Sequence, residues 1–341
     1  MSKMSDNSVR IGVVGVGYWG PNIIRNLNGM EGVQLVGVCD LSKDALNRVK
    51  LQYPDISLFN SFDNMIDLAK PDGVVIVTPA STHSTLARQA LECGIDVLVE
   101  KPLATTYDDA LMLTRISKEN KRVLMVGHTF LYSEYVRTLK KIIANGEIGK
   151  ILHIYSERLA LGQIRSDVDV LWNLGPHDIS IVNYLIGSTP MEVAAWGLNI
   201  LDPVKADLVV GKLVYPHGIT VYLHLSWLDP QKVRKMIIVG SEKMIIYDDT
   251  NSEAPVIIHD KNAIIGPEGK ILMQNGDKKI VSVSLPEPLG VELRHFIRCV
   301  QKRENPITDG IHGSEVIAVL ESLSLSMKNG GTPVSVQLRE L

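Results

Sequence analysis

The chain has 341 residues, of which 45% are hydrophobic and 21% charged, and a formal net charge of −3. This length allows two domains, and the composition is that of a soluble globular protein. Charges of both signs are mixed along the chain, so neither a nucleic-acid nor a membrane partner is expected. The polar start and the short apolar runs predict no signal peptide and no spanning helix. Three widely spaced cysteines indicate free thiols, no metal site and a cytoplasmic location.

The first third of the chain alternates apolar runs with helical patterns. Runs without polar alternation are typical of strands covered on both faces, and helices between them imply a parallel, doubly wound sheet. The expected strands are residues 11–14, 34–40, 72–79, 96–100 and 122–127, and the expected helices are 21–27, 43–52, 62–69, 84–93 and 107–120.

Beyond residue 130 the pattern changes to many strand-like runs joined by short turns, which predicts a large, mainly antiparallel sheet. The expected strands are residues 151–161, 192–200, 206–215, 219–227, 233–239, 243–247 and 255–259, and the expected helices are 133–145, 172–185, 290–301 and 313–329. We therefore expect an α/β Rossmann domain over residues 1–128 and an α+β domain over residues 129–341. The second domain is expected to bind substrate and to pair with a copy of itself in a homodimer or homotetramer.

A glycine motif follows the first apolar run. Gly15, Gly17 and Gly20 have the G-x-G-x-x-G spacing of a dinucleotide-binding turn between a strand and a helix. The turn needs the first glycine, close approach of a pyrophosphate needs the second, and helix packing needs the third. Tyr18 and Trp19 lie inside the turn and are assigned to the same cofactor site.

An acidic residue closes the second expected strand. Asp40 lies twenty residues after Gly20, where a carboxylate meets the adenosine ribose hydroxyls. It is followed by Leu41 and not by an arginine, so a 2′-phosphate would meet a carboxylate, and NAD is favoured over NADP. Lys43 weakens this preference, because a cation so close to Asp40 could interact with a 2′-phosphate.

Ligands of doubly wound sheets bind at the carboxyl ends of the strands. Three segments lie there: Thr78-Pro79, Glu100-Lys101-Pro102 and Gly127-His128-Thr129. From them we assign Thr78, Pro79, Glu100, Lys101 and His128 to the cofactor site, together with His83. His83 is expected to cap or pack at the start of the helix after Pro79, next to this site. Lys101 is the most informative of these residues, because a lysine there can donate to a substrate oxygen and stabilise a developing alkoxide. A solvated lysine at a strand end is the alternative.

The second domain carries Trp172-Asn-Leu-Gly-Pro-His177-Asp178. Asn173 and His177 are four residues apart and would share one face of a helix. A histidine is suited to moving the proton of a hydroxyl, although a structural histidine is the commoner case. Arg158 and Arg165 are candidates for binding a phosphate or carboxylate of the substrate, and surface ion pairs are the equally good alternative.

Together these motifs resemble the glucose-fructose oxidoreductase, inositol dehydrogenase and MocA family. The resemblance covers essentially the whole chain and implies a Rossmann domain followed by a sheet domain. Three segments resemble the nucleotide-sugar branch, whose members serve surface-polysaccharide synthesis: Gly17–Asn22, Leu171–Ile179 and Ser226-Trp-Leu-Asp-Pro230.

The resemblance implies that Lys101 polarises the substrate oxygen while His177 takes its proton and a hydride moves to the nicotinamide. The family pattern has an aspartate four residues before the histidine, whereas this chain has Asn173. An amide cannot favour the imidazolium as a carboxylate does, so His177 is expected to be a weaker base. This departure leaves the direction of reaction open.

The motifs predict an NAD-dependent oxidoreductase, and the resemblance to the nucleotide-sugar branch implies that it acts at C3 of a nucleotide-linked sugar. A free polyol or inositol dehydrogenase, a ketosugar reductase and a non-catalytic NAD-binding protein are the alternatives. A basic or aromatic pocket in residues 155–175 and 225–235 would favour the nucleotide sugar over a free polyol.

Overall fold

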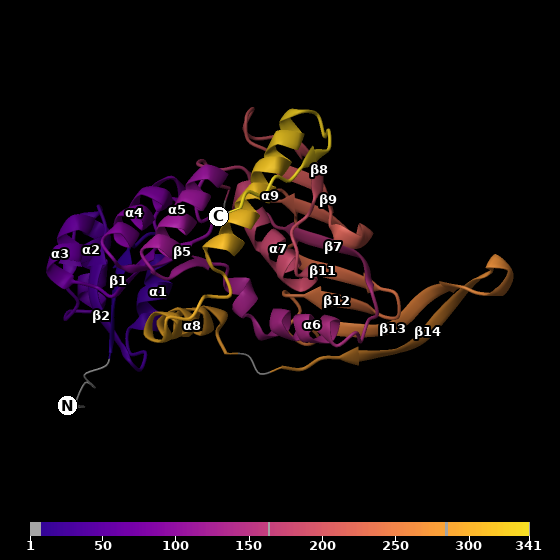
Figure 1. Cartoon of the computed structure of the whole chain (residues 1–341), viewed down its shortest axis with the longest axis horizontal. Coiled ribbons are helices and arrows are strands. Elements are labelled where there is room, and N and C mark those ends of the chain that lie inside the picture. The colour runs from indigo at the N-terminus through magenta and orange to yellow at the C-terminus, as the bar shows by residue number, and fades with distance from the viewer. Residues whose placement is uncertain (1–7, 163, 284–285, 341) are drawn as a thin grey trace. The chain divides into compact units, whose positions relative to one another are not determined.

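The computed structural model describes residues 8–162, 164–283 and 286–340. The chain packs into two compact units (Figure 1). Unit 1 comprises Met1–Tyr132, Pro286–Ile317 and Glu340–Leu341, and unit 2 comprises Ser133–Leu285 and Ala318–Arg339. The segment Pro286–Ile317 thus packs with the N-terminal residues in unit 1, whereas the sequence analysis expected all residues after 128 to belong to the second domain.

Among its described residues, unit 1 contains a six-stranded parallel sheet in the order β3-β2-β1-β4-β5-β6. Its strands are β1 (Val9–Val14), β2 (Val33–Cys39), β3 (Leu58–Phe59), β4 (Gly73–Ile76), β5 (Asp96–Glu100) and β6 (Leu124–Gly127). The order reverses between β1 and β4, which is the doubly wound arrangement and confirms the predicted fold of this part. The central strands are apolar because both faces of the sheet are covered.

The helices of unit 1 cover the two faces of this sheet, with α1 and α8 on one face and α4 and α5 on the other (Figure 1). They are α1 (Gly20–Leu27), α2 (Lys43–Gln52), α3 (Phe62–Ala69), α4 (Ala80–Glu92), α5 (Tyr107–Glu119) and α8 (Pro288–Lys302). Ser42, Ser61 and Thr106 accept backbone N–H groups as N-caps of α2, α3 and α5, which explains why these helices start where they do.

The C-terminal segment of unit 1 lies beside strand β6. The N–H of Val126 donates to the carbonyl of Thr308, and the Thr308 hydroxyl donates to the carbonyl of Val126. The short helix η1 (Thr129–Tyr132) follows β6 and packs against α8. Helix α9 (Gly310–Lys328) begins in unit 1 and continues into unit 2 from Ala318.

In the described part of unit 2, nine strands form one mixed sheet in the order β14-β13-β12-β11-β7-β10-β9-β8-β15. Only the β7–β10 pair is parallel, so the predicted, mainly antiparallel sheet is confirmed. The strands are β7 (Ile151–Leu159), β8 (Glu192–Leu198), β9 (Leu208–Val214), β10 (Thr220–Ser226), β11 (Val233–Gly240), β12 (Met244–Asp248), β13 (Val256–Ile265), β14 (Ile271–Ile280) and β15 (Val334–Ser335).

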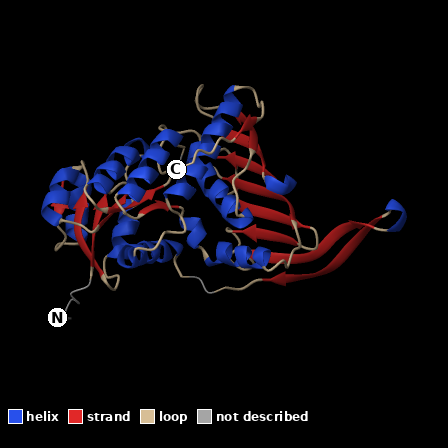
Figure 2. Cartoon of the chain, viewed as in Figure 1, coloured by secondary structure: helices blue, strands red, loops and turns tan. Residues whose placement is uncertain are grey.

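One face of this sheet is covered by helices (Figure 2). Helix α6 (Glu134–Ala144) packs on α7 (Val170–Ile186), and α7 contacts β7, β9 and β10. Two further 3-10 turns occur at η2 (Pro216–Gly218) and η3 (Pro267–Gly269). Because side chains alternate along a strand, every second residue of these strands points to the opposite face.

Strands β13 and β14 continue beyond the edge of β12 as a two-stranded hairpin (Figure 2). Beyond His259, the residues of β13 pair only with β14 among the described strands. Every residue of β14 is exposed, so no buried face imposes the alternation by which a strand is recognised in a sequence. This is why the sequence did not predict β14.

No helix in the described part of the chain has the length and apolarity needed to cross a membrane. The cysteines are free, and Cys39 and Cys299 are buried whereas Cys93 is exposed.

Candidate active site

The glycine turn after β1 has the geometry that its spacing predicts. Gly15 has φ +99°, and a Cβ there would lie 2.7 Å from the carbonyl oxygen of Val77. A Cβ on Gly20 would lie 2.4 Å from the carbonyl oxygen of Gly15. A Cβ on Gly17 would meet no described atom within 4 Å, so the space over this residue is open to a ligand. Two of the glycines are thus required by packing, and the third borders open space.

Helix α1 presents its N-terminus to this space. Its N-cap residue Trp19 makes no side-chain cap, and its first turn carries no acidic residue. The first N–H groups and the positive end of the helix dipole therefore suit an anion such as a pyrophosphate. Asp40 lies beside the turn, where its carboxylate accepts the N–H groups of Val16 at 2.6 Å and Ser42 at 2.7 Å. These residues fit a dinucleotide with a free ribose diol.

His83 connects two of the strand-end segments. It lies in the first turn of α4 and is buried, with Nδ1 2.7 Å from the carbonyl oxygen of Pro102 and Nε2 2.8 Å from that of Thr78. The imidazole therefore fixes the segment after β4 to the segment after Lys101. Pro79 is exposed between Thr78 and the start of α4. A part for these residues in cofactor binding stays a prediction.

Glu100 joins the glycine turn to the E-K-P segment. Its carboxylate accepts the backbone N–H of Lys101 at 3.2 Å and the indole N–H of Trp19. A Cβ on Gly127 would lie 3.2 Å from the Cδ and Oε1 atoms of Glu100, so this glycine leaves room for the glutamate. Burial raises the pKa of Glu100 to about 7, against the lowering effect of the Lys101 charge. Tyr18, by contrast, is exposed.

His128 follows β6 and is buried. Its ring meets that of His312 edge-on, with 5.2 Å between the ring centroids. Burial lowers the pKa of both imidazoles, that of His312 to about 4, so both are neutral at pH 7. Unit 1 therefore brings together the glycine turn, Asp40, Thr78, His83, Glu100, Lys101 and His128 at the carboxyl edge of its sheet.

Helix α7 of unit 2 carries Asn173 and His177 on one half-buried face. Asp169 caps the helix by accepting the N–H of Trp172 at 2.9 Å. Gly175 lies between them, and a Cβ there would come within 3.1 Å of Leu171 and 3.2 Å of Leu320. Glycine thus lets the helix pack closely at the turn that carries both polar residues.

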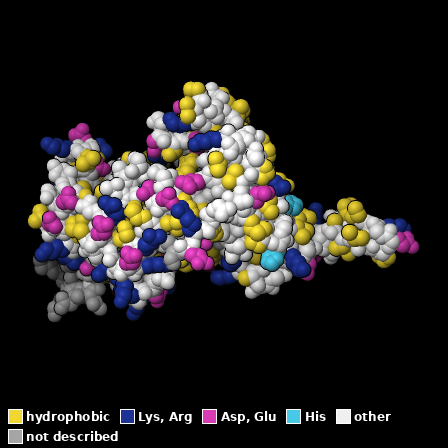
Figure 3. All heavy atoms as spheres, turned by 45° about the horizontal axis from the view of Figure 1, so that its top comes forward, with side chains coloured by type: hydrophobic (Ala, Val, Ile, Leu, Met, Phe, Trp, Pro, Cys, Tyr) yellow, Lys and Arg dark blue, Asp and Glu magenta, His cyan; other side chains and the backbone are white. Residues whose placement is uncertain are grey.

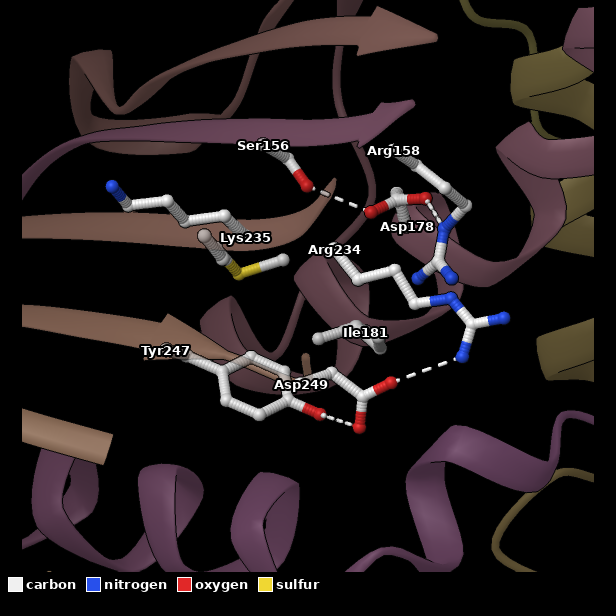
Figure 4. Close-up of a pocket in the computed structure, with 9 residues that line it drawn as sticks. Ser156, Arg158, Asp178, Ile181, Arg234, Lys235, Tyr247 and Asp249 are labelled. Carbon is white, nitrogen blue, oxygen red and sulfur yellow. Dashed lines mark hydrogen bonds and ion pairs between the residues drawn. The ribbon is translucent and has the colours of Figure 1, made fainter. Parts of the chain in front are cut away.

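Arg158 and Asp178 form a buried ion pair between β7 and α7 (Figure 4). The Arg158 Nε–H donates to one carboxylate oxygen of Asp178, and the Ser156 hydroxyl donates to the other at 2.7 Å. Asp178 lies in the third turn of α7 and is buried. The guanidinium of Arg158, a candidate for anion binding, is thus engaged with an acid of its own chain.

A second arginine lies next to this pair. Arg234 is the register partner of Arg158 on β11, and it pairs with Asp249 at 3.1 Å. Together with Lys235 and Tyr247 these groups line a small pocket (Figure 4). Arg165, the other predicted anion-binding residue, is exposed and pairs with Asp167 at 2.6 Å.

Three residues of these polar clusters were not predicted. Glu292 of α8 is buried in unit 1 and accepts the Thr129 hydroxyl at 2.8 Å. Arg234, which lies beside Arg158, and His312, which lies beside His128, are also far from those residues in the sequence. No local pattern marks them, because strand pairing and the return of the chain bring them there. The described residues hold no group of three or more His, Cys, Asp or Glu side chains that could bind a metal ion.

Comparison with known proteins places this geometry in a family. Residues 9–128 match the model of the GFO/IDH/MocA oxidoreductase family with an NAD-binding Rossmann fold, and residues 136–246 match the C-terminal domain model of the same family. An uncharacterized oxidoreductase of Escherichia coli K12 is 32% identical over 70% of this chain and 70% of its own. The chain belongs to the GFO/IDH/MocA oxidoreductase family. The predicted resemblance, fold, enzyme class and NAD cofactor are thereby confirmed.

Two relatives with a named activity match a larger share of this chain. A UDP-N-acetylglucosamine 3-dehydrogenase of Acidithiobacillus ferrooxidans is 27% identical over 91% of this chain and 94% of its own. Its solved structure superposes with a TM-score of 0.80 at 25% identity, covering 94% of this chain and 98% of that one. A myo-inositol 2-dehydrogenase of Thermotoga maritima is 25% identical over 89% of this chain and 92% of its own.

Proposed function

We propose that this oxidoreductase transfers a hydride between NAD and C3 of a nucleotide-linked sugar, in the synthesis of surface polysaccharides in the cytoplasm. The observation that supports this most is the similarity to a UDP-N-acetylglucosamine 3-dehydrogenase along nine tenths of both chains. The chain also has a lysine after β5 and a histidine on α7, the two groups that such a reaction needs.

The cofactor is assigned to the residues that fit it. The open space over Gly17 and the N-terminus of α1 would hold the pyrophosphate, and Asp40 would hold the adenosine ribose. The nicotinamide supplies the hydride acceptor when NAD is bound. Lys101, at the carboxyl end of β5, donates to the sugar oxygen and stabilises the negative charge that develops on it. His177 takes the hydroxyl proton as the general base.

Asn173 determines how strong that base is. Its amide lies one helical turn before His177 and carries no charge, so it can orient the imidazole without favouring the imidazolium. A weaker base slows proton removal from an alcohol. This residue therefore supports the second candidate, a reductase that acts on the corresponding ketosugar.

The small pocket of unit 2 was expected to distinguish between the substrate classes. Residues 155–175 and 225–235 contribute Arg158 and Arg234 to it, but each of these arginines pairs with an aspartate of the same lining, Asp178 and Asp249, so the pocket does not favour an anionic, nucleotide-linked substrate over a free polyol. Trp227 does not offer an aromatic surface, because it is buried and its indole donates to Asp207 at 2.7 Å. The similarity to a myo-inositol 2-dehydrogenase supports the free polyol as the competing substrate.

We further propose that the sheet face opposite α7 pairs with a second copy of this chain. An apolar row crosses five strands there, because Tyr222 pairs with Tyr155, Tyr155 with Ile237, Ile237 with Ile246, and Ile246 with Ile257. Hydrophobic side chains also lie along the projecting hairpin (Figure 3), including the exposed Ile265, Ile271 and Met273. Burial of this surface would favour a dimer or tetramer. A monomer at micromolar concentration in light scattering would contradict this assignment.

The function is tested by single-turnover experiments. The NAD-saturated protein is mixed with UDP-hexosamines, UDP-uronates and free polyols, and reduced nicotinamide is followed by its fluorescence. We expect a signal with one class of nucleotide sugar, with the oxidised carbon assigned by NMR of the product. Turnover of a free polyol alone would support the competing substrate. Silence with NAD demonstrably bound, together with oxidation of NADH by a 3-ketosugar, would establish the reductase.

A further inference from the structure

Helix α7 has a weak point at the turn that carries the proposed base. Gly175 and Pro176 lie inside the helix, between Asn173 and His177. Proline has no N–H group, so the carbonyl of Trp172 cannot receive the usual helical hydrogen bond from residue 176. Glycine gives the backbone more conformational freedom than any other residue. The turn that leads to His177 is therefore held less firmly by its own backbone than an ordinary helical turn.

The helix before this turn is anchored by other parts of unit 2. The Asp169 carboxylate accepts the backbone N–H of Trp172 at 2.9 Å. The indole N–H of Trp172 donates to the hydroxyl of Ser324 on α9 at 3.0 Å. The N–H of Val170 donates to the carbonyl of Ala206 at 3.0 Å. The first turn of α7 is thus fixed at its cap, at its backbone and at one side chain.

Asp178 supplies the anchor on the other side of the weak turn. It directly follows His177 and is 3% exposed. The Ser156 hydroxyl donates to its Oδ1 at 2.7 Å, and the Nε–H of Arg158 donates to its Oδ2 (Figure 4). Ser156 and Arg158 are two residues apart on β7, so they project from the same face of the strand. A carboxylate that is held at both oxygens cannot rotate without losing a hydrogen bond.

The position of Asp178 determines the direction of His177. Successive side chains of an α-helix are about 100° apart around the axis. Because Asp178 is held against β7, the preceding imidazole is directed to the half-buried face that also carries Asn173. The Ser180 hydroxyl donates to the carbonyl of His177 at 2.9 Å, which holds the backbone at the same point. The anchors on the two sides compensate for the weak backbone between them.

We propose that Asp178 is a positioning residue of the active site. Clamped by Ser156 and Arg158, it fixes the rotation of α7 and so directs the imidazole of His177 for proton transfer. Arg158 acts in this arrangement through Asp178, on the side of α7 that faces the sheet. The consequence for turnover rests on the proposed function, whereas the fixed orientation of the imidazole does not.

The orientation is tested by NMR of the full-length protein without substrate, with ¹³C in the histidine rings. The Cε1–H signal of His177 is assigned by its loss in His177→Gln. Ser156→Ala removes one of the two donors to Asp178 and keeps the ion pair with Arg158. We expect the His177 signal to broaden or split in this variant, because the released carboxylate lets the imidazole take more than one orientation.

The matched control is Ser326→Ala. Ser326 lies on α9 and, like Ser156, is 0% exposed. Its hydroxyl accepts the N–H of Ala195 at 3.0 Å and donates to the carbonyl of Thr332 at 2.7 Å. This variant also loses a buried hydroxyl of unit 2, but one that does not contact Asp178. It should leave the His177 signal unchanged.

Steady-state turnover tests the consequence for the reaction. Misplacing a catalytic group by about 1 Å can cost about 10²-fold in rate. We expect Ser156→Ala to lower kcat about tenfold, as for a smaller displacement, and to keep KM within about twofold because no binding group is removed. Ser326→Ala should keep both values within about twofold of those of the unaltered protein.

Three results would overturn the proposal. The first is a His177 signal that is identical in Ser156→Ala and in the unaltered protein. The second is an equal fall of kcat in the two alanine variants, and the third is a changed His177 signal with an unchanged kcat. If no sugar is turned over, the proposed function fails, while the NMR comparison still decides whether Asp178 fixes His177.

Discussion

The two units each bury a polar cluster, and the clusters are built on opposite principles. In unit 2, Arg158 and Asp178 are oppositely charged, and the Ser156 hydroxyl satisfies the second carboxylate oxygen. In unit 1, the buried groups Glu100, Glu292, His128 and His312, here called the strand-end cluster, contain no oppositely charged pair. An oxygen of Glu292 and ring nitrogens of His128 and His312 have no hydrogen-bond partners among the described residues. The first arrangement fixes a helix on a sheet. The second costs stability, and such groups are typical of sites where ligands bind.

This difference shows which cluster should respond to which perturbation. A satisfied pair is sensitive to the loss of one partner, because the remaining charge is then buried alone. A cluster of buried titratable groups without an ion pair is sensitive to pH, because burial has shifted its protonation equilibria. The predictions below test these expectations.

The largest effect is expected on the stability of unit 2. Asp178→Ala leaves the Arg158 guanidinium buried without its acid, which should lower the free energy of unfolding by about 3–5 kcal/mol. The matched control is Asp167→Ala, which breaks the exposed pair with Arg165 and should cost about 0–1 kcal/mol. Urea unfolding at pH 7 measures both. Equal losses in the two variants would show that Arg158 finds another partner.

The next largest effect is expected on turnover, with NAD binding nearly unchanged. Lys101→Ala removes the donor that stabilises the developing alkoxide, so kcat should fall about 10²- to 10³-fold. The dissociation constant of NAD should stay within about threefold, because the assigned pyrophosphate and ribose groups are elsewhere in unit 1. Stopped-flow turnover and calorimetry give the two values. A collapse of NAD affinity would make Lys101 a cofactor residue instead.

The pH dependence of stability should distinguish the clusters. Glu100 has a pKa of about 7 in the folded protein, raised from 4.5, so the folded state binds the proton more tightly. Its stabilising contribution is therefore complete below pH 4.5 and is lost as the pH rises through 7. The size is about 3 kcal/mol from the shift in pKa.

Urea unfolding of the unaltered protein and of Glu100→Gln, each at pH 5 and pH 8, measures this contribution. The variant should lose less stability between the two pH values than the unaltered protein does. Identical pH dependence in the two proteins would show that Glu100 has an ordinary pKa.

The clusters also differ in how far the sequence predicts them. The glycine turn, Asp40 and the E-K-P segment were predictable because each follows a strand of a parallel sheet, and strand ends meet at one edge by topology. Glu292 lies on α8, whose sequence pattern is that of any amphipathic helix. Its burial in unit 1 could not be predicted, because it depends on the packing of the C-terminal segment Pro286–Ile317 with the N-terminal residues.

In unit 2, the sequence singles out Arg158 but does not identify its partner. Asp178 is adjacent to His177 in the chain, yet it points from α7 towards β7, and only the packing of α7 on the sheet brings it to Arg158. Asn173 and His177 were easier to predict, because the spacing of four within one helix fixes their common face.

The smallest effect concerns the base on α7. Asn173→Asp places a carboxylate one turn before His177, which favours the imidazolium and should raise the pKa of His177. The acidic limb of the kcat profile for sugar oxidation should then move to higher pH, while the rate above that limb rises. Asn173→Ser, which removes the amide without adding charge, is the control and should leave the limb in place. An unchanged profile in the aspartate variant would separate Asn173 from proton transfer. It would also make the reductase direction, which rests on this amide, no better supported than oxidation.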